Sequence, residues 1–385
     1  MILFCTSGLA VNAFTVYQPY ILQYNGFTNT QSSDLIMLRS LFSFFAMFLT
    51  GRYYKIFSYR IGLCLSGLLA AVSFLCFGLS RTYLHYCVSA AILGVAFGFG
   101  TMIPITILLS RWFCRHRTLA LGICSSSTGL STLGIPSLLT AMIRQGGLAR
   151  TFLWEAAAVV LLTVAALFLI GDPEKEACRE EDGASAGETE QEKKLPARAW
   201  WLLIPILLLT GAVTSVGYSH LSMVMTSSGF SAETVARGIM VSGLALTVGK
   251  LLYGAVSEKT SVYCGNRIFG IAALAGLGLI CLNGGRTAVI FAGLLLYGGG
   301  LAFTTVGLSA WCGELCTGTQ YAATVRRFQI GYSAGTLLFS SFPGILADRA
   351  GGSYIPAFGC FFLCCGFVLF SIQRIIRKSS KQAEA

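Results

Sequence analysis

Residues 287–313 read TAVIFAGLLLYGGGLAFTTVGLSAWCG, a run of 27 consecutive residues without Asp, Glu, Lys or Arg. About 20 helical residues are enough to cross the ~30 Å hydrocarbon layer of a bilayer, so this stretch is long enough to span a membrane. It is continuously apolar and lacks the period-two alternation of a transmembrane β-strand. Because backbone groups in lipid must be paired within the protein, we predict that the stretch is an α-helix.

The rest of the sequence repeats this pattern. Of its 385 residues, 55% are hydrophobic and 11% are charged, and the mean hydropathy is +0.72. Soluble domains are about a quarter charged, so this composition excludes an ordinary soluble enzyme and a disordered chain. We predict an all-α integral membrane protein with twelve transmembrane helices, two of which carry internal charge. The twelve predicted spans are 1–33, 34–57, 61–80, 82–110, 118–143, 156–171, 199–232, 233–256, 268–285, 287–313, 328–347 and 350–373.

The basic residues of the connecting loops predict the orientation. If both termini are inside, the inner segments hold 19 Lys and Arg residues and the outer segments hold 6. Cytoplasmic loops carry the excess of positive charge, so we predict a multi-pass plasma-membrane protein with both termini cytoplasmic. This bias, together with the anionic inner leaflet, accounts for the net charge of +11. We therefore expect the lipid bilayer as a partner, and no nucleic acid.

One internal segment differs from every other loop. Residues 172–198 contain nine acidic and five basic residues, and such a segment cannot bury apolar area, so we predict a cytoplasmic acidic linker. It separates an N-terminal six-helix bundle, 1–171, from a C-terminal six-helix bundle, 199–376, and residues 377–385 form a cytoplasmic tail. The first stretch lacks a basic n-region, so we expect no cleaved signal peptide. The sequence leaves open whether a further segment precedes Met1.

The two predicted bundles resemble each other in the spacing of a few residues. Gly94 precedes Trp112 by 18 residues, and Gly293 precedes Trp311 by 18. A proline followed by a glycine pair also occurs in each bundle, as Pro136 with Gly146-Gly147 and as Pro343 with Gly351-Gly352. This repetition predicts a weak duplication of a six-helix unit, as in transporters with two similar halves.

Three loops carry motifs. Residues 111–122 read RWFCRHRTLALG, residues 254–259 read GAVSEK, and residues 344–351 read GILADRAG. In this order and over essentially the whole chain, the motifs resemble those of the major facilitator superfamily, and within it the monocarboxylate-porter and oxalate/formate-antiporter branches. The counterpart of the second motif in the first bundle, GRYYK at 51–55, departs from the pattern because Lys55 stands where an acid is expected.

The resemblance implies a fold and a role for the loops. It implies the major facilitator fold, with two six-helix halves that rock around a midplane site, and a secondary active transporter rather than an enzyme. It also implies that residues of the first two motifs act in conformational gating. These residues are Arg111, Arg115, Arg117, Gly122, Gly254, Glu258 and Lys259.

Lys250 is the first candidate for a substrate-binding residue. A charge inside a span costs about 3 kcal/mol on insertion scales and marks a functional site by default. Lys250 shares a helix face with Gly243, Thr247 and Gly254, and small residues mark the packed or cavity side of a membrane helix. In the resembling branches a basic residue at this position, usually Arg, binds the substrate carboxylate. The alternative is that Lys250 snorkels to the cytoplasmic face.

Arg39 is the other basic residue inside a predicted span and a second candidate for substrate contact. It shares a face with Ser43, Ala46 and Thr50, and Asp34 lies five residues before it, so an outer gate or an ion pair is the alternative. Oxalate carriers have a further cation in span 11, whereas residues 331–335 read GYSAG. The resemblance therefore argues against a dicarboxylate that is held by two charges.

Spans 1 and 7 supply the remaining candidates. In span 1 we expect Asn12, Tyr17 and Gln18 to line the substrate cavity, with helix packing as the alternative reading. In span 7, His220 is a candidate for proton coupling, because imidazole titrates near physiological pH. A histidine near a helix end that is merely hydrogen-bonded is the alternative.

These observations predict a function and keep one rival. We predict a carrier, monomeric, that moves a small organic anion, in the first place a monocarboxylate, as a symporter with a proton or as an antiporter with a counter-anion. The alternative is an exporter of drugs or other neutral or cationic molecules. Such an exporter would be favoured by a membrane-embedded acid, but Asp34, Glu155, Glu233 and Glu314 all lie near predicted span ends. No cysteine group has His or acidic neighbours at metal-ligand spacing, so we expect no metal and no cofactor.

Overall fold

The structure is a computed structural model, and it describes residues 2–100, 135–170, 197–316 and 321–383, together with residues 104, 105, 108, 127, 128 and 131. Within these residues the regular elements are all helices. The chain divides into two compact units. The first unit comprises Met1–Tyr17 and Leu38–Gln191, and the second comprises Gln18–Met37 and Glu192–Ala385. The end of the first span and the start of the second therefore belong to the second unit.

The N-terminal half of the sequence begins with a π-helix, η1, which continues directly into an α-helix. Two later helices start at hydroxyl caps, because Ser58 accepts a hydrogen bond from the backbone N–H of Ile61 and Thr82 accepts one from that of His85. The helices are η1 (Phe4–Ala13), α1 (Phe14–Asn25), α2 (Asn29–Ile56), α3 (Tyr59–Leu79), α4 (Tyr83–Phe99) and α7 (Ile135–Leu169). In the first unit α3 packs between α4 and α7.

Helix α7 contains a sharp break. Gly147 has φ 81° and ψ 166°, a conformation that glycine adopts without steric cost. The break falls between the two stretches, 118–143 and 156–171, that we predicted as separate spans. The segment after Gly147 buries Phe152, Glu155, Ala156 and Val159 on one face.

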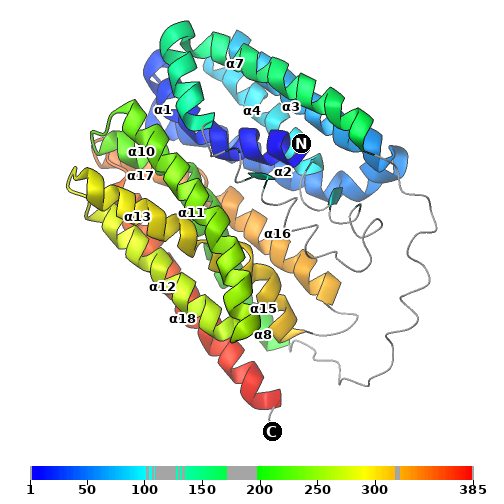
Figure 1. The fold of residues 1–385 in the computed structure, drawn as a ribbon, viewed down its shortest axis with the longest axis vertical. Helices are drawn as coiled ribbons and strands as arrows, with labels where there is room; N and C mark the ends of the chain where they lie inside the picture. Colours follow the sequence, from blue (N-terminus) through cyan, green and yellow to red (C-terminus); the bar gives the residue numbers. More distant parts are fainter. Residues whose placement is uncertain are drawn as a thin grey trace. The chain divides into compact units, whose positions relative to one another are not determined.

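The C-terminal half repeats this plan with shorter pieces. A π-helix, η2, again lies in its first span, and α13 ends at Gly300 before two short helices complete that span. Figure 1 shows α11, α12 and α13 lying side by side in the second unit, with α18 beside α12. The helices are α8 (Ala197–Gly211), η2 (Ala212–Val216), α9 (Gly217–Ser219), α10 (Leu221–Ser227), α11 (Ala232–Lys259), α12 (Val262–Cys281), α13 (Thr287–Gly300), α14 (Ala302–Thr305), α15 (Gly307–Leu315), α16 (Tyr321–Phe339), α17 (Phe342–Arg349) and α18 (Ile355–Ala383).

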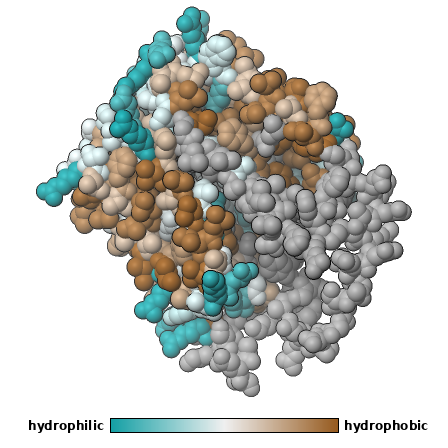
Figure 2. All heavy atoms as spheres, in the orientation of Figure 1, coloured by the Kyte–Doolittle hydropathy of each residue, from teal (hydrophilic) through white to brown (hydrophobic). Residues whose placement is uncertain are grey.

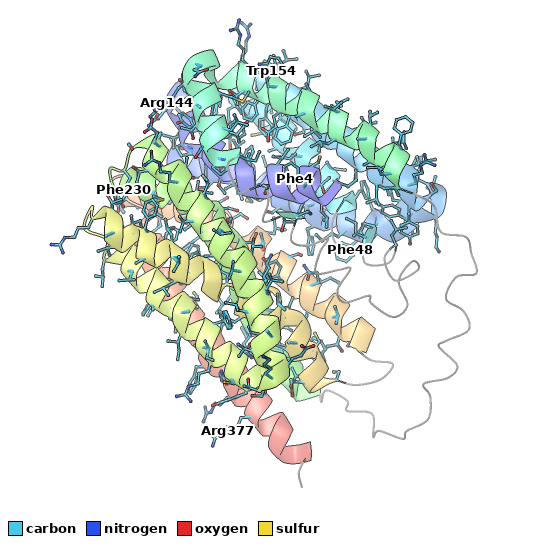
Figure 3. All side chains as sticks on the ribbon, in the orientation of Figure 1. Phe4, Phe48, Arg144, Trp154, Phe230 and Arg377 are labelled. Carbon is cyan, nitrogen blue, oxygen red and sulfur yellow. The ribbon has the colours of Figure 1, made fainter. Side chains whose placement is uncertain are left out.

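The surface of both units is suited to lipid. Nine helical segments in the described part of the chain are long and apolar enough to cross a membrane, and large apolar side chains such as Trp154, Leu161 and Trp201 are exposed. Figure 2 shows hydrophobic residues over the flank of the second unit, between hydrophilic residues at its two ends. Phe48 and Trp154, which are labelled in Figure 3, are exposed aromatic residues of the first unit. The helices therefore present apolar flanks to lipid, as membrane spans require.

In the second unit, loops that we placed on one side of the membrane lie at one end. The backbone N–H of Tyr354 lies 3.3 Å from Ser227 Oγ, and Asn283 Nδ2 lies 3.4 Å from Ser228 Oγ. At the other end, Gln373 Nε2 donates to the carbonyl of Tyr263 at 3.0 Å. Phe230 and Arg377, labelled in Figure 3, lie at these opposite ends. The alternation of the predicted loops is therefore consistent with the structure of this unit.

The helix caps reveal the register of the internal repeat. The capping residues Thr28 and Ser231, at the starts of α2 and α11, are 203 residues apart, as are Ser58 and Ser261 at the starts of α3 and α12. The close helix contacts follow this register to within one residue, because the contacted residues Arg39 and Ser242 are 203 apart and the glycines that meet them are 204 apart. A Cβ on Gly94 would collide with the carbonyl oxygen of Arg39, and a Cβ on Gly298 with that of Ser242. By its contact Gly94 therefore corresponds to Gly298, five residues after the Gly293 of the tryptophan spacing.

Candidate transport site

Lys250 lies on α11, nine residues before its end at Lys259. At 1.5 Å per residue this is about 13 Å along the helix axis. The side chain is half-buried. In the described part of the chain, no hydrogen bond or ion pair joins it to another residue. A cation at this depth with no partner is costly, so the side chain marks a place where a counter-charge would be stabilised.

The face of α11 that carries Lys250 is buried at Gly243 and half-buried at Thr247 and Gly254. We predicted that Gly243, Thr247 and Gly254 would mark the packed or cavity side of this helix. The tight contact between α11 and α13 lies one residue before Lys250, where a Cβ on Gly249 would collide with the carbonyl of Gly299. By contrast, no heavy atom lies within 4 Å of a Cβ built on Gly254. Gly254, one turn after Lys250, therefore does not belong to a helix–helix seam among the described residues, whereas Gly243 on the same face is buried.

Gln18 on α1 is buried, with 1% of its side chain exposed. Neither its amide nitrogen nor its amide oxygen has a hydrogen-bond partner among the described residues. Buried polar groups are nearly always paired, by protein, water or a ligand. This amide is therefore available to a bound polar molecule. Asn12 lies in η1, but its side chain is outside the described residues.

Tyr17 is engaged elsewhere. Its side chain is fully buried, and its hydroxyl donates a hydrogen bond to Glu155 Oε2 at 2.5 Å. Its ring stacks on that of Phe152 at 4.2 Å. Glu155 itself is 5% exposed and lies eight residues after the break at Gly147. The sequence placed Glu155 near a span end, whereas in the structure it lies well inside the helical segment between Gly147 and Leu169 and is buried.

Arg39 on α2 is buried, with 4% exposed. Its guanidinium carbon lies 5.8 Å from the ring centroid of Phe14, within the range of a cation–π interaction. Asp34, which we considered as its partner, accepts a hydrogen bond from Ser341 Oγ at 2.6 Å. Arg39 is therefore held against an aromatic ring of the first unit, while Asp34 contacts α16–α17 in the second.

His220 is fully buried between two hydrogen-bond partners. Nδ1 lies 3.0 Å from the carbonyl oxygen of Val216, and Nε2 lies 3.1 Å from Ser33 Oγ. Because a carbonyl oxygen only accepts, Nδ1 carries the hydrogen. Nε2 is then the position that accepts from Ser33 in the neutral ring and would donate in the charged one. The ring also stacks on Tyr354 at 6.0 Å.

The first two turns of α2 dock along α17 within the second unit. The carboxylate of Asp348 accepts hydrogen bonds from the backbone N–H groups of Asn29 at 3.1 Å and Thr30 at 2.9 Å, and from both of their side chains. One turn earlier on α17, a Cβ on Gly344 would collide with Ser33 and with the carbonyl of Asn29. An anion at a helix N-terminus is stabilising, so Asp348 anchors α2 to α17.

The residues expected to act in gating divide into two groups. Arg111, Arg115, Arg117 and Gly122 lie outside the described residues. Glu258 and Lys259 are exposed at the end of α11, where the positive charge of Lys259 complements the helix dipole. Among the described residues, no group of three or more His, Cys, Asp or Glu side chains could hold a metal ion.

The helical architecture and the apolar flanks define a multi-pass membrane protein. The family model of the Major Facilitator Superfamily matches residues 1–335, so the chain belongs to this superfamily, whose fold has twelve helices. It is a transporter and not an enzyme.

Several known proteins are similar to the chain. The agnestins efflux protein AgnL12 of Paecilomyces divaricatus is 24% identical over 369 residues, covering 93% of this chain and 80% of that protein. The uncharacterized MFS-type transporter YhjX of Escherichia coli K12 is 23% identical over 250 residues, 60% of this chain and 62% of that protein.

Solved structures share the fold. The nucleoside transporter NupG matches with a TM-score of 0.70 at 14% identity, over 99% of this chain and 96% of that one. A D-xylose–proton symporter matches with a TM-score of 0.71 at 13% identity, over 95% and 94%. At these identities the likeness defines the fold and leaves the substrate open.

Proposed function

We propose that this transporter carries a small organic anion, in the first place a monocarboxylate, by alternating access with proton symport or anion exchange. The observation that carries the proposal is Lys250, a half-buried cation on α11 with no partner among the described residues. It lies on the helix face of Gly254, which meets no described heavy atom within 4 Å, and Gly249 rather than this face makes the tight contact with α13. In a site of low dielectric a carboxylate is the natural partner of such a cation.

Gln18 supports the same reading. Its buried amide, which has no hydrogen-bond partner among the described residues, could donate to a carboxylate oxygen or accept from a substrate hydroxyl. The middle of α16 contributes no second cation, because residues 328–339 contain neither Lys nor Arg. One fixed charge suits a monoanion better than a dianion.

The topology and the membrane belong to the proposal as well. We propose a monomer in the plasma membrane with both termini cytoplasmic, because the loops assigned to the inside hold 19 basic residues and those outside hold 6. Single cysteines at residue 185 and at Arg286 test this orientation, in a background that lacks reactive native cysteines. An impermeant thiol reagent added to intact cells should label position 286 and not position 185. The reverse pattern would invert the topology.

An exporter of drugs or other neutral or cationic molecules is the second candidate. Two observations favour it, namely the buried carboxyl of Glu155 and the similarity to a protein named as an efflux protein. The carboxyl of Glu155 is enclosed and bonded to Tyr17, which leaves little room for a bulky cation. Efflux is a direction of transport, and an anion can also be exported. We therefore place the anion carrier first.

The test compares three variants in proteoliposomes with acetate, lactate, pyruvate and oxalate as radiolabelled probes. Lys250→Gln should weaken apparent affinity about 30-fold or more, because removing one partner of a buried charge pair costs about 2–5 kcal/mol. Lys250→Arg should retain part of the transport, since the charge is kept. Arg237→Gln, which removes an exposed cation from the same helix, should behave as wild type. Unchanged affinity in well-folded Lys250→Gln would reject the anion site and favour the exporter.

A further inference from the structure

The carboxyl of Glu155 has an unusual hydrogen-bond environment. Oε2 accepts from the hydroxyl of Tyr17, whereas Oε1 is buried and has no partner in the described part of the chain. A carboxylate can accept about four hydrogen bonds, so this one has a small share of its capacity filled. A buried carboxylate so poorly paired is costly in its charged form.

The tyrosine that bonds this carboxyl belongs to a cluster of aromatic rings. Phe152 stacks on Tyr17 from one turn before Glu155, and the rings of Phe74 and Phe77 on α3 lie 6.5 Å and 5.3 Å from that of Phe152. The titratable groups that face it are Tyr17 from α1 and Cys5 from η1.

One cation adjoins the aromatic cluster, and it lies over a ring other than Tyr17. The Arg39 guanidinium from α2 lies over Phe14, whose centroid is 6.2 Å from that of Tyr17. Within the described residues, no ion pair reaches Glu155. Among the described residues a counter-charge for the carboxylate is therefore missing, while a hydroxyl donor is present, and this arrangement accommodates a bound proton.

We propose that Glu155 is a proton-binding site of this carrier, with Tyr17 as the residue that positions its carboxyl. In the transport cycle the carboxylate would take up one proton from one side, become a carboxylic acid, and return the proton to the other side as a carboxylate. This inference rests on the proposed anion transport, because one proton and one monocarboxylate together carry no net charge. It selects proton symport over anion exchange.

The internal repeat supports the assignment to one half of the molecule. Tyr17 and His220 are 203 residues apart, which is the distance between the matching helix caps. Glu155 and Gly359 are 204 residues apart, which is the distance between Gly94 and Gly298. No heavy atom lies within 4 Å of a Cβ built on Gly359. The second half therefore has no carboxyl at the matching position, and the proposed proton site is not a common feature of the scaffold.

The experiment separates exchange from proton-driven uptake in proteoliposomes. The probes are radiolabelled acetate, lactate and pyruvate, with protein-free liposomes as the blank for passive permeation. Wild-type protein should exchange internal for external probe without a gradient. With one unit of pH difference, acid outside, it should accumulate the probe about tenfold, because one pH unit corresponds to about 1.36 kcal/mol. A pH-sensitive dye inside the liposomes should record one proton entering with each anion.

Glu155→Gln should keep the exchange and lose both the accumulation and the dye signal. Glu155→Asp keeps a carboxyl and should retain accumulation at a lower rate. Glu233→Gln, which removes an exposed carboxyl from the first turn of α11, should accumulate the probe as wild type does.

The outcomes that contradict the inference differ from those that contradict the proposed function. Accumulation by Glu155→Gln at the wild-type level overturns the proton site and leaves anion transport intact. The same holds for wild-type exchange that does not respond to the pH gradient. If Glu155→Gln loses exchange as well, Glu155→Asp decides, because recovery of both activities supports the site and loss of both assigns Glu155 to packing. Absence of exchange in the wild type overturns the proposed function, and with it the role of Glu155 in that transport.

Discussion

In the pair α2–α4 the carbonyl of Arg39 occupies the space that Gly94 leaves free, and in the pair α11–α13 the carbonyl of Ser242 does the same at Gly298. Within each half, two helix backbones thus meet in the same way. The residue whose carbonyl makes the contact is a buried cation in the first half and a serine in the second. By the same register, Lys250 corresponds to Met47. The comparison teaches that the scaffold is repeated while the charged side chains are not.

The first spans of the two halves show the same contrast. The π-helix η1 ends at Ala13 and η2 ends at Val216, again 203 residues apart. π-helical segments occur frequently at functional sites. Directly after them, Tyr17 bonds to Glu155 in the first unit, whereas His220 bonds to Ser33 in the second. Equivalent positions are thus polar in both halves, but they carry different chemistry.

The largest effect is expected where the repeated scaffold is broken. Gly94→Val and Gly298→Val each place a side chain on a carbonyl oxygen of the neighbouring helix. Overpacking typically costs about 1–3 kcal/mol, and a backbone carbonyl cannot rotate away as a side chain can. We expect most of the folded protein to be lost in both variants, measured as the monodisperse fraction after detergent extraction.

The control for this pair is Gly359→Ala, because no heavy atom lies within 4 Å of a Cβ at that position. It should extract like the wild type. If only one of the two valine variants fails, the two contacts are not equivalent and the proposed register of the repeat is incorrect.

These contacts also show how much the sequence could predict. The apolar stretches located the spans well. Helix α2 covers residues 29–56 against the predicted charge-containing span 34–57, and α13 begins at Thr287, where the charge-free stretch 287–313 begins. Helix caps moved other boundaries. Ser261 caps α12, so this helix begins before Arg267 rather than after it. The register of the repeat was missed because tryptophan spacing carries no information about which glycines touch a neighbouring backbone.

The position of Glu155 was missed for a different reason. We located spans by the absence of charge, so the sixth span was drawn from residue 156 and Glu155 became its edge. The helix in fact restarts after Gly147, eight residues earlier. In the sequence Glu155 is a charged residue and therefore ends an apolar stretch. Only its contact with Tyr17 in the folded protein shows that this carboxyl is buried within the helix bundle. Lys250 was found because its span remained apolar on both sides.

The second prediction moves the cation of Lys250 to Met47, the corresponding position in the first half. Lys250→Met should raise the half-saturating concentration of monocarboxylate about 30-fold or more, for the charge-pair reason given above. Adding Met47→Lys restores one cation at the equivalent place in the first half. We expect no recovery, because Met47 belongs to the first unit, whereas Lys250 and the buried amide of Gln18 both belong to the second. Recovery in the double variant would mean that the halves are interchangeable around the substrate.

A smaller effect is expected at the contact between α2 and α17. Asp348→Ala removes the acceptor of the hydrogen bonds from Asn29 and Thr30. Loss of a helix cap costs about 0.5–2 kcal/mol, which lowers the melting temperature by about 2–4 °C per kcal/mol in a domain of this size. Differential scanning fluorimetry in detergent measures the shift. Asp348→Asn should fall between the wild type and the alanine variant, and an unshifted alanine variant would mean that α2 does not depend on this cap.

The smallest effect is expected at Ser33, and it addresses the contrast between Tyr17 and His220. Ser33→Ala removes the partner of His220 Nε2 but leaves the bond from Nδ1 to Val216. One neutral hydrogen bond contributes about 0.5–1.5 kcal/mol, so folding should be little affected. If the proton moves through Glu155, the pH dependence of uptake should match the wild type in Ser33→Ala and change in Glu155→Asp. Uptake measured over a series of pH values in both variants decides between the two sites. A changed pH profile in Ser33→Ala, together with a wild-type profile in Glu155→Asp, would place proton coupling at His220.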